Sequence, residues 1–90
     1  MLTLKTTGRF QKDYKKSVTS GRDIARLKQV MTWIATEQDL PPALRDHKLI
    51  GNYQGRRECH LAGDWLLIYK LEKDAVIFER TGSHSELLNK

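Results

Sequence analysis

Three histidines, His47, His60 and His84, lie in separate segments of the second half of the chain, and Asp64 and Arg80 lie between the last two. Histidine can give or take a proton near neutral pH. Arginine presents a fixed fork of donors that suits phosphate oxygens. Acid–base cleavage of a phosphodiester needs this combination of side chains. The pattern favours a small ribonuclease that uses no metal.

The first element expected to support these residues is a short strand over residues 2–6. A helix should follow it from about Thr7 and Gly8, because apolar residues then recur every four positions. These residues are expected to form the inner face of the helix: Phe10, Tyr14 and Val18.

A second helix is expected after Gly21, which allows a tight turn. Ser20 with Asp23 resembles a capping arrangement at its start. Its apolar stripe consists of Ile24, Leu27, Val30 or Met31, and Ile34. The prolines Pro41 and Pro42 require the helix to end before them, so the two helices should form a hairpin.

The rest of the chain has the spacing of strands. Residues 43–56 lack a regular pattern and are expected to form a loop, whereas residues 57–61, 65–71 and 75–81 are strand candidates joined by short turns. Such short connections indicate antiparallel hairpins. Residues 65–69 are apolar at every position, which predicts a central strand covered by the helices. We expect a single α+β domain over residues 1–90, with a small, mainly antiparallel sheet, an N-terminal strand and a helical hairpin on one face.

This arrangement suggests how the polar residues come together. A tight turn would set His60 near Trp65 across the first hairpin, although a shift of one residue in the register would reverse the faces. Gly82 permits a bend after the last strand. Ser83 and Glu86 fit the capping box of a terminal helical turn, which would fix His84 on an ordered element.

Charge is concentrated at the start of the chain. The net charge is +5, and residues 1–28 hold eight Lys and Arg against two Asp, which gives this segment +6. A basic surface of this kind attracts nucleic acid or an acidic protein. No apolar run is long enough to span a membrane, no signal peptide is visible, and the single Cys59 cannot form an internal disulfide. We therefore expect a soluble cytoplasmic protein.

Four segments in this order and spacing resemble a known family, the bacterial toxins of the RelE superfamily, in the YafQ branch of type II toxin–antitoxin systems. The resemblance covers almost the whole chain and implies a RelE-like α+β fold. The segments are Asp46-His47-Lys48-Leu49 with Gly51, Tyr53 and Gly55; Arg57-Glu58-Cys59-His60; residues 64–70; and residues 79–84.

The resemblance implies an mRNA endoribonuclease that cuts messages in the ribosomal A site, beside ribosomal RNA. The nucleophile would be the RNA's own 2′-hydroxyl, with no cofactor and no metal. The implied catalytic set is His47, His60, Asp64, Arg80 and His84. Arg80 would bind phosphate, His84 would donate a proton, His60 or Asp64 would accept one, and His47 would assist; an exchange of acid and base stays open.

The remaining implied contacts are with RNA and with protein partners. The expected RNA-binding residues are Trp65, Lys48, Arg57 and Leu88, although relatives often carry an aromatic residue where this chain has Leu88. The family implies a cognate antitoxin, expected to be of the ribbon-helix-helix type, in a heterotetramer that binds operator DNA only through the antitoxin. An acidic antitoxin segment would suit the basic residues of the helical hairpin, Lys12, Lys15, Lys16, Arg22 and Arg26.

Two other classes of function could use parts of this set of residues. A zinc site could combine the histidines with Cys59 or Asp64, but no C-x-x-C or H-x-x-x-H pair supports it, and Cys59 and His60 should point to opposite faces of a strand. The stronger alternative is a toxin like those of the ParE branch, which shares the fold and inhibits DNA gyrase by binding. Such a binder has no chemical need for a set of His, Asp and Arg residues.

Overall fold

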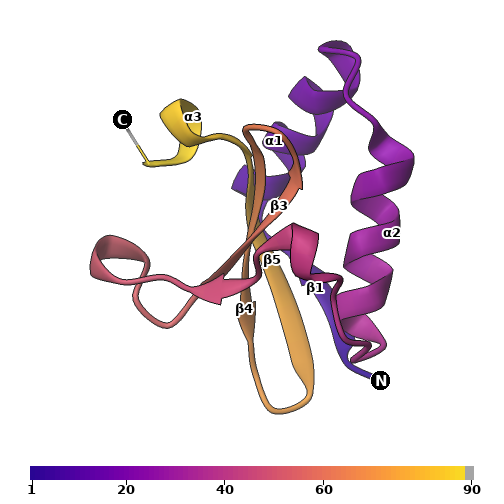
Figure 1. Ribbon diagram of the computed structural model, residues 1–90, viewed down its shortest axis with the longest axis vertical. Helices are drawn as coiled ribbons and strands as arrows, with labels where there is room; N and C mark the ends of the chain where they lie inside the picture. Colours follow the sequence, from indigo (N-terminus) through magenta and orange to yellow (C-terminus); the bar gives the residue numbers. More distant parts are fainter. Residues whose placement is uncertain (89–90) are drawn as a thin grey trace.

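The computed structural model describes residues 1–88, except for the side chains of Asn52 and Leu88. Figure 1 shows two helices on one side of a twisted sheet and a third, short helix on the other side. The elements are β1 (Thr3–Thr6), α1 (Gly8–Thr19), α2 (Ile24–Ala35), β2 (His47–Lys48), β3 (Arg57–Ala62), β4 (Trp65–Leu71), β5 (Ala75–Ser83) and α3 (His84–Leu88). Short 3-10 turns span Pro42–Leu44 and Gly51–Tyr53.

The sheet has the strand order β1-β5-β4-β3-β2. β1 runs parallel to β5, and the other neighbours are antiparallel. The prediction of an α+β fold with β4 at the centre is confirmed. The prediction of a loop with local turns over residues 43–56 is confirmed by the two 3-10 turns, but it missed β2, which pairs His47 with Glu58 and Lys48 with Arg57. A strand of two residues is too short to show a hydrophobic period in the sequence.

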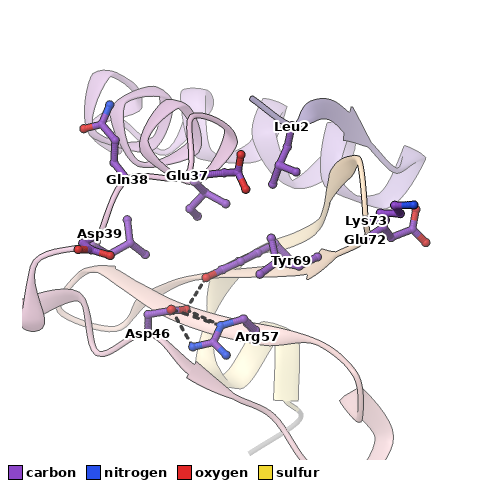
Figure 2. A pocket seen from close by; sticks show the side chains of 12 residues that line it. Leu2, Glu37, Gln38, Asp39, Asp46, Arg57, Tyr69, Glu72 and Lys73 are labelled. Atoms are coloured by element: carbon purple, nitrogen blue, oxygen red, sulfur yellow. Dashed lines mark hydrogen bonds and ion pairs between the residues drawn. The ribbon is translucent and has the colours of Figure 1, made fainter.

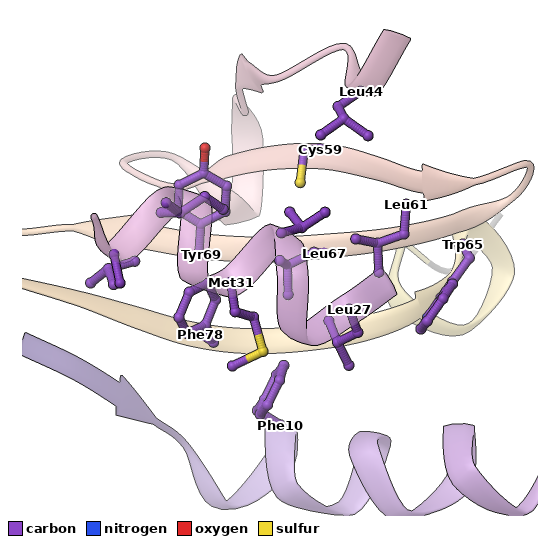
Figure 3. Packing of buried hydrophobic residues seen from close by; sticks show 14 of the residues in the cluster. Phe10, Leu27, Met31, Leu44, Cys59, Leu61, Trp65, Leu67, Tyr69 and Phe78 are labelled. Carbon is purple, nitrogen blue, oxygen red and sulfur yellow. The ribbon is translucent and has the colours of Figure 1, made fainter. Parts of the chain in front are cut away.

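The main core lies between the sheet and the two long helices. It includes Phe10 of α1, the apolar stripe of α2 and the alternate residues of β3, β4 and β5 that face them (Figure 3). The largest fully buried side chains of these strands are Tyr69, Phe78 and Leu67. β4 is buried on both faces, as its uninterrupted apolar run predicts.

The inner face of α1 differs from the prediction at one position. Val18 is 52% exposed, whereas Ser17 is buried and its hydroxyl donates to the carbonyl of Asp13 at 2.9 Å. At 100° per residue, position 17 lies within about 20° of Phe10 around the helix, and position 18 lies about 80° away. A spacing of four residues therefore drifts off the inner face after two turns.

The caps of the helices also correct the sequence interpretation. Thr7 caps α1, since its side chain accepts from the N–H of Phe10 at 3.0 Å. Ser20 closes the carboxyl end of α1 and does not begin α2. Asp23 is the residue that caps α2, by accepting from the N–H of Arg26 at 3.1 Å. A carboxylate at this position also suits the positive end of the helix dipole.

A bulge between β3 and β4 decides which side chains share a face. His60 lies opposite Leu66, and Ala62 lies opposite Trp65, so Leu61 is an extra residue on β3. Trp65 therefore faces the helices, and His60 faces the other side of the sheet. The expectation that His60 lies beside Trp65 is wrong for this reason.

Asp13 of α1 bonds to the part of β5 that β1 does not cover. The pairing with β1 ends at Phe78, and the Asp13 carboxylate then accepts from the backbone N–H of Thr81 at 3.2 Å. The same carboxylate accepts from Arg80 Nε at 2.7 Å and Nη2 at 3.2 Å. Both side chains are about 15% exposed, at 14% and 15%. A single helix residue thus completes the hydrogen bonding of the strand edge and holds an arginine.

We predict that Asp13→Ala lowers the free energy of unfolding by about 2–3 kcal/mol, somewhat less than the loss of one partner from a fully buried ion pair. The substitution leaves a half-buried guanidinium and a strand N–H without their acceptor. Urea unfolding measures the difference, and the exposed Asp39→Ala is the control. Equal stability of the two variants would contradict the role given to Asp13.

Candidate active site

The face of the sheet that turns away from α1 and α2 carries most of the residues singled out in the sequence. Glu58 and His60 of β3 lie there opposite Ile68 and Leu66 of β4, and Arg80 of β5 lies on the other side of Ile68. A small apolar cluster forms the floor of this face. Its members are Leu66, Ile68 and Leu87, with Leu49 and Tyr53 packed against them.

The three histidines come together along one side of this face. The ring centroids of His47 and His60 are 6.3 Å apart, and those of His60 and His84 are 5.8 Å apart. They come from β2, β3 and the start of α3, so the pairing of β2 with β3 and the return of the chain after β5 both contribute. We name these three residues the histidine row.

His84 is held by Asp64, which lies in the turn between β3 and β4. Trp65 pairs with Ser83 on antiparallel strands. Asp64, which precedes Trp65, therefore lies next to His84, which follows Ser83. Asp64 Oδ1 is 2.5 Å from His84 Nδ1 and accepts from the backbone N–H of His84 at 3.2 Å. The hydrogen bond from the His84 side chain is the main reason why the pKa of Asp64 is lowered. An ionised Asp64 only accepts hydrogen bonds, so Nδ1 of His84 carries the proton and Nε2 is the ring nitrogen left for chemistry.

His47 is held through both of its ring nitrogens. Nδ1 lies 2.6 Å from the carbonyl oxygen of Arg45, and because a carbonyl only accepts, Nδ1 donates. Nε2 lies 3.0 Å from Oε2 of Glu58. Glu58 is 4% exposed, and its other oxygen has no partner among the described residues. His47 must break one of these bonds to exchange a proton with a substrate.

Glu58 is a residue of this face that the sequence interpretation missed. It lies two positions before His60 on one strand, so the two side chains must point to the same side of the sheet. That spacing was visible in the sequence and could have placed Glu58 beside the histidines. Nothing in the sequence indicated that it pairs with His47, because that contact depends on β2.

Arg80 is oriented for a role on this face by its ion pair with Asp13. The hydrogen bond to the Asp13 carboxylate is the largest of the causes that raise the pKa of Arg80, so the guanidinium stays charged. Its Nε and Nη2 bind Asp13, and the side chain of Tyr53 also contributes to the raised pKa. The remaining N–H donors of the fork can bind an anion such as a phosphate.

Two of the predicted RNA-binding residues lie on the helix side of the sheet. Trp65 is 2% exposed in the main core, with the Arg22 guanidinium 5.3 Å from the centre of its ring, so it has no free face for a base. Arg57 points toward the helices and binds Asp46 at 2.8 Å, and Asp46 also accepts from the hydroxyl of Tyr69 (Figure 2). Trp65 shares the helix side of β4 with Leu67 and Tyr69, and Arg57 pairs with Tyr69. Arg57 also borders the hollow that Lys48 lines, so its contact with RNA stays a prediction.

The structure does not decide whether the other two predicted residues, Lys48 and Leu88, contact RNA. Lys48 is exposed on β2 and borders a hollow with Arg56, so it stays a prediction. The side chain of Leu88 lies outside the described part of the structure.

Cys59 lies apart from the histidines. It is fully buried against the helices, and burial raises the pKa of its thiol to about 12. The expectation that Cys59 and His60 point to opposite faces is confirmed by their partners across the sheet, Leu67 and Leu66. Within residues 1–88, no group of three His, Cys, Asp or Glu side chains is arranged to hold a metal ion.

The helix that carries His84 is anchored by Glu86. Ser83 and Glu86 form the predicted capping box: the Ser83 N–H donates to Glu86 at 2.9 Å, and the Glu86 N–H donates to Ser83 at 3.2 Å. Glu86 also binds the ammonium group of Lys16 on α1. Gly82 leaves room for this contact, because a Cβ there would lie 3.2 Å from the Glu86 carboxylate. Together with its capping role, the Lys16 bond lowers the pKa of Glu86 to about 2.

This low pKa predicts a pH-dependent anchor for α3. The unfolded chain should titrate Glu86 near its ordinary pKa of 4.5, so its contribution to stability is full above pH 4.5 and is lost as the pH falls toward 2. Because the side chain is 33% exposed, we expect a contribution of about 1 kcal/mol or less. Urea unfolding of the wild type and Glu86→Gln should differ at pH 7, and the difference should shrink steadily below pH 4.5 and vanish only as the pH reaches about 2. Glu72 lies on an exposed turn, so the difference in unfolding free energy between the wild type and Glu72→Gln should be the same at each pH. A difference for Glu86→Gln that also stays constant with pH would oppose this account.

The comparison with known proteins agrees with the fold. Residues 2–89 match the family described as "Bacterial toxin of type II toxin-antitoxin system, YafQ". The mRNA interferase toxin YafQ of Escherichia coli (strain K12) is 39% identical over 82 residues, 90% of this chain and 89% of that protein. The crystal structure of YafQ from E. coli BL21(DE3) matches with a TM-score of 0.92 at 35% identity, over 97% of this chain and 98% of that chain. The crystal structure of the E. coli DinJ–YafQ toxin–antitoxin complex matches with a TM-score of 0.89 at 37% identity, over 96% of each chain. The chain belongs to the YafQ family of bacterial toxins of type II toxin–antitoxin systems.

Proposed function

We propose that this chain is a ribosome-dependent mRNA endoribonuclease that inhibits translation by cutting messages in the ribosomal A site. The observation that carries the proposal is the row of three histidines beside Asp64, on the same face of the sheet as Arg80. The name of the E. coli relative, mRNA interferase toxin, supports the same activity. A toxin that only binds DNA gyrase would need no such proton-transfer residues, so the ParE-like alternative is disfavoured.

The reaction begins at the RNA's own 2′-hydroxyl. Its oxygen attacks the adjacent phosphorus, the bond to the 5′-oxygen of the next nucleotide breaks, and a 2′,3′-cyclic phosphate and a 5′-hydroxyl result. His60 takes the proton of the 2′-hydroxyl. His84 enters the step as the imidazolium, keeps its Nδ1 proton on Asp64 and gives its Nε2 proton to the leaving 5′-oxygen. Asp64 binds His84 in this scheme, which favours His60 over Asp64 as the proton acceptor.

Arg80 and His47 stabilise charge in this scheme. The donors of Arg80 that Asp13 does not use bind the phosphate oxygens, whose negative charge increases in the transition state. His47 has Nε2 3.0 Å from the carboxylate of the buried Glu58, which fixes its ring at the end of the histidine row. No metal ion or organic cofactor takes part in these steps.

The partners of the chain follow from the same proposal. It binds mRNA and ribosomal RNA in the bacterial cytoplasm. Among the described residues, no helix is long and apolar enough to cross a membrane. A cognate antitoxin neutralises it, as the DinJ–YafQ complex suggests, and the pair forms a heterotetramer that binds operator DNA through a ribbon-helix-helix antitoxin. Arg9, Lys12 and Lys15 are exposed basic residues of α1 available to an acidic antitoxin segment, whereas Lys16 of α1 and Arg22 of the following turn already contact Glu86.

Replacing the 2′-hydroxyl tests the chemistry. A message with a single 2′-deoxynucleotide on the 5′ side of the cut should not be cleaved there, because the nucleophile is missing. Programmed ribosomes, gel analysis and end-group labelling measure the outcome, and the unmodified message should yield 5′-hydroxyl ends. Cleavage at the deoxy position, or 5′-phosphate ends, would exclude this mechanism.

Substitutions at His84 and Asp64 test the assigned roles. His84→Gln should lower kcat by about 10²- to 10⁴-fold, the usual contribution of a general acid. Asp64→Asn should give a smaller loss of kcat at unchanged KM, and Asp64→Glu should restore part of it, because Asp64 acts by orienting His84. Ser85→Ala, on the exposed side of the same helix, is the control. Wild-type kcat in His84→Gln would remove His84 from the mechanism.

A further inference from the structure

A hollow lies next to Arg80. It has a volume of about 300 Å³, and its lining comes from the start of α1, from β5 and from the turn before β3. Its lining residues are Thr7, Arg9, Tyr53, Arg56, Glu79 and Arg80. Arg80 belongs both to this hollow and to the face that carries the histidine row. An extended chain bound at Arg80 can therefore continue into the hollow.

The charges in this hollow leave one arginine without an internal partner. Arg56 binds Glu79 at 2.8 Å, and Arg80 binds Asp13 at 2.7 Å. Arg9 is exposed and forms no ion pair with any residue that the structure describes. The three guanidinium groups are balanced by only two carboxylates, those of Glu79 and Asp13, so Arg9 leaves the hollow with one excess positive charge.

The wall opposite Arg9 is aromatic and fixed in place. Tyr53 packs on the apolar floor under the histidine row, and its hydroxyl donates to the carbonyl of Leu87 at 3.1 Å. An aromatic ring beside guanidinium groups is the usual surface for single-stranded RNA, where the ring supports a base and the cations bind phosphates. The Arg56 guanidinium is oriented in the same way, since Glu79 binds two of its nitrogens.

We propose that this hollow is a subsite for the message nucleotide next to the scissile phosphate, with Arg9 and Arg56 binding its phosphate and Tyr53 supporting its base. The inference rests on the proposed function and extends it. Arg80 then joins two consecutive binding positions, one over the histidine row and one in the hollow. Arg9 is a binding residue that contributes to affinity and positioning, and the proton transfers do not require it.

Binding of an uncleavable RNA tests the subsite separately from catalysis. The probe is a fluorescein-labelled 2′-O-methyl RNA hexamer, and its anisotropy with the free protein is measured over a range of salt concentrations. Arg9→Gln should weaken binding by about 5- to 10-fold and lower the slope of log Kd against log salt by about 0.7, the value for one phosphate contact on a single strand. Lys12→Gln removes one charge from α1 outside the hollow and should change the affinity and the salt slope much less. Arg9→Lys should recover part of the affinity that Arg9→Gln loses.

Cleavage on programmed ribosomes separates failure of the subsite from failure of the function. Arg9→Gln should raise KM and leave kcat near the wild-type value. If the wild type cleaves and Arg9→Gln binds the hexamer no worse than Lys12→Gln does, the subsite is wrong while the function stands. Loss of ribosome binding by Arg9→Gln with unchanged hexamer affinity would also overturn the inference, because Arg9 would then contact ribosomal RNA. If the wild type neither binds nor cleaves RNA, the proposed function fails first.

Discussion

The carboxylate of Asp13 connects the helical layer of the molecule to the face of the sheet that carries its polar residues. It binds a backbone N–H of β5 beyond the end of β1, and it holds the guanidinium of Arg80. Without this acceptor, a strand edge would lack a partner and the arginine would have many rotamers to choose from. The arginine is instead positioned before any substrate arrives, which is the condition under which fixed charges stabilise a transition state best.

The alternation of side chains along the strands assigns the remaining residues to their faces. One bulge between β3 and β4 and another between β4 and β5 interrupt it. Apolar residues of β3, β4 and β5 turn toward α1 and α2, while Glu58 and His60 turn the other way. The register of β4 and β5 then brings Asp64 beside His84, although twenty positions separate them in the chain. The histidine row and its acceptors are thus a consequence of strand pairing, and no loop has to fold over the site to assemble it.

Much of this arrangement could be predicted from the sequence, because the strands from residue 57 onward, α2 and the capping box at Ser83 follow local patterns of polarity. The errors have a common cause. β4 is apolar at every position from 65 to 69, so no period shows which face Trp65 takes. The faces of Arg57 and His60 relative to β4 depend on the extra residue at Leu61. The pair of His47 with Glu58 depends on a strand of two residues, and the partner of Arg80 lies 67 positions away on α1. Contacts between distant segments require the register, and the sequence alone left that open.

The most direct test of the central claim, that this face of the sheet cleaves messages, is to map mRNA 5′ ends in translating extracts. The extract receives the wild-type protein, His84→Ala or no protein, with a parallel sample depleted of ribosomes. We expect discrete new in-frame 5′ ends carrying hydroxyl groups, which require both His84 and ribosomes. Uncut messages in the presence of folded wild-type protein would contradict the account and would favour a toxin that acts by binding.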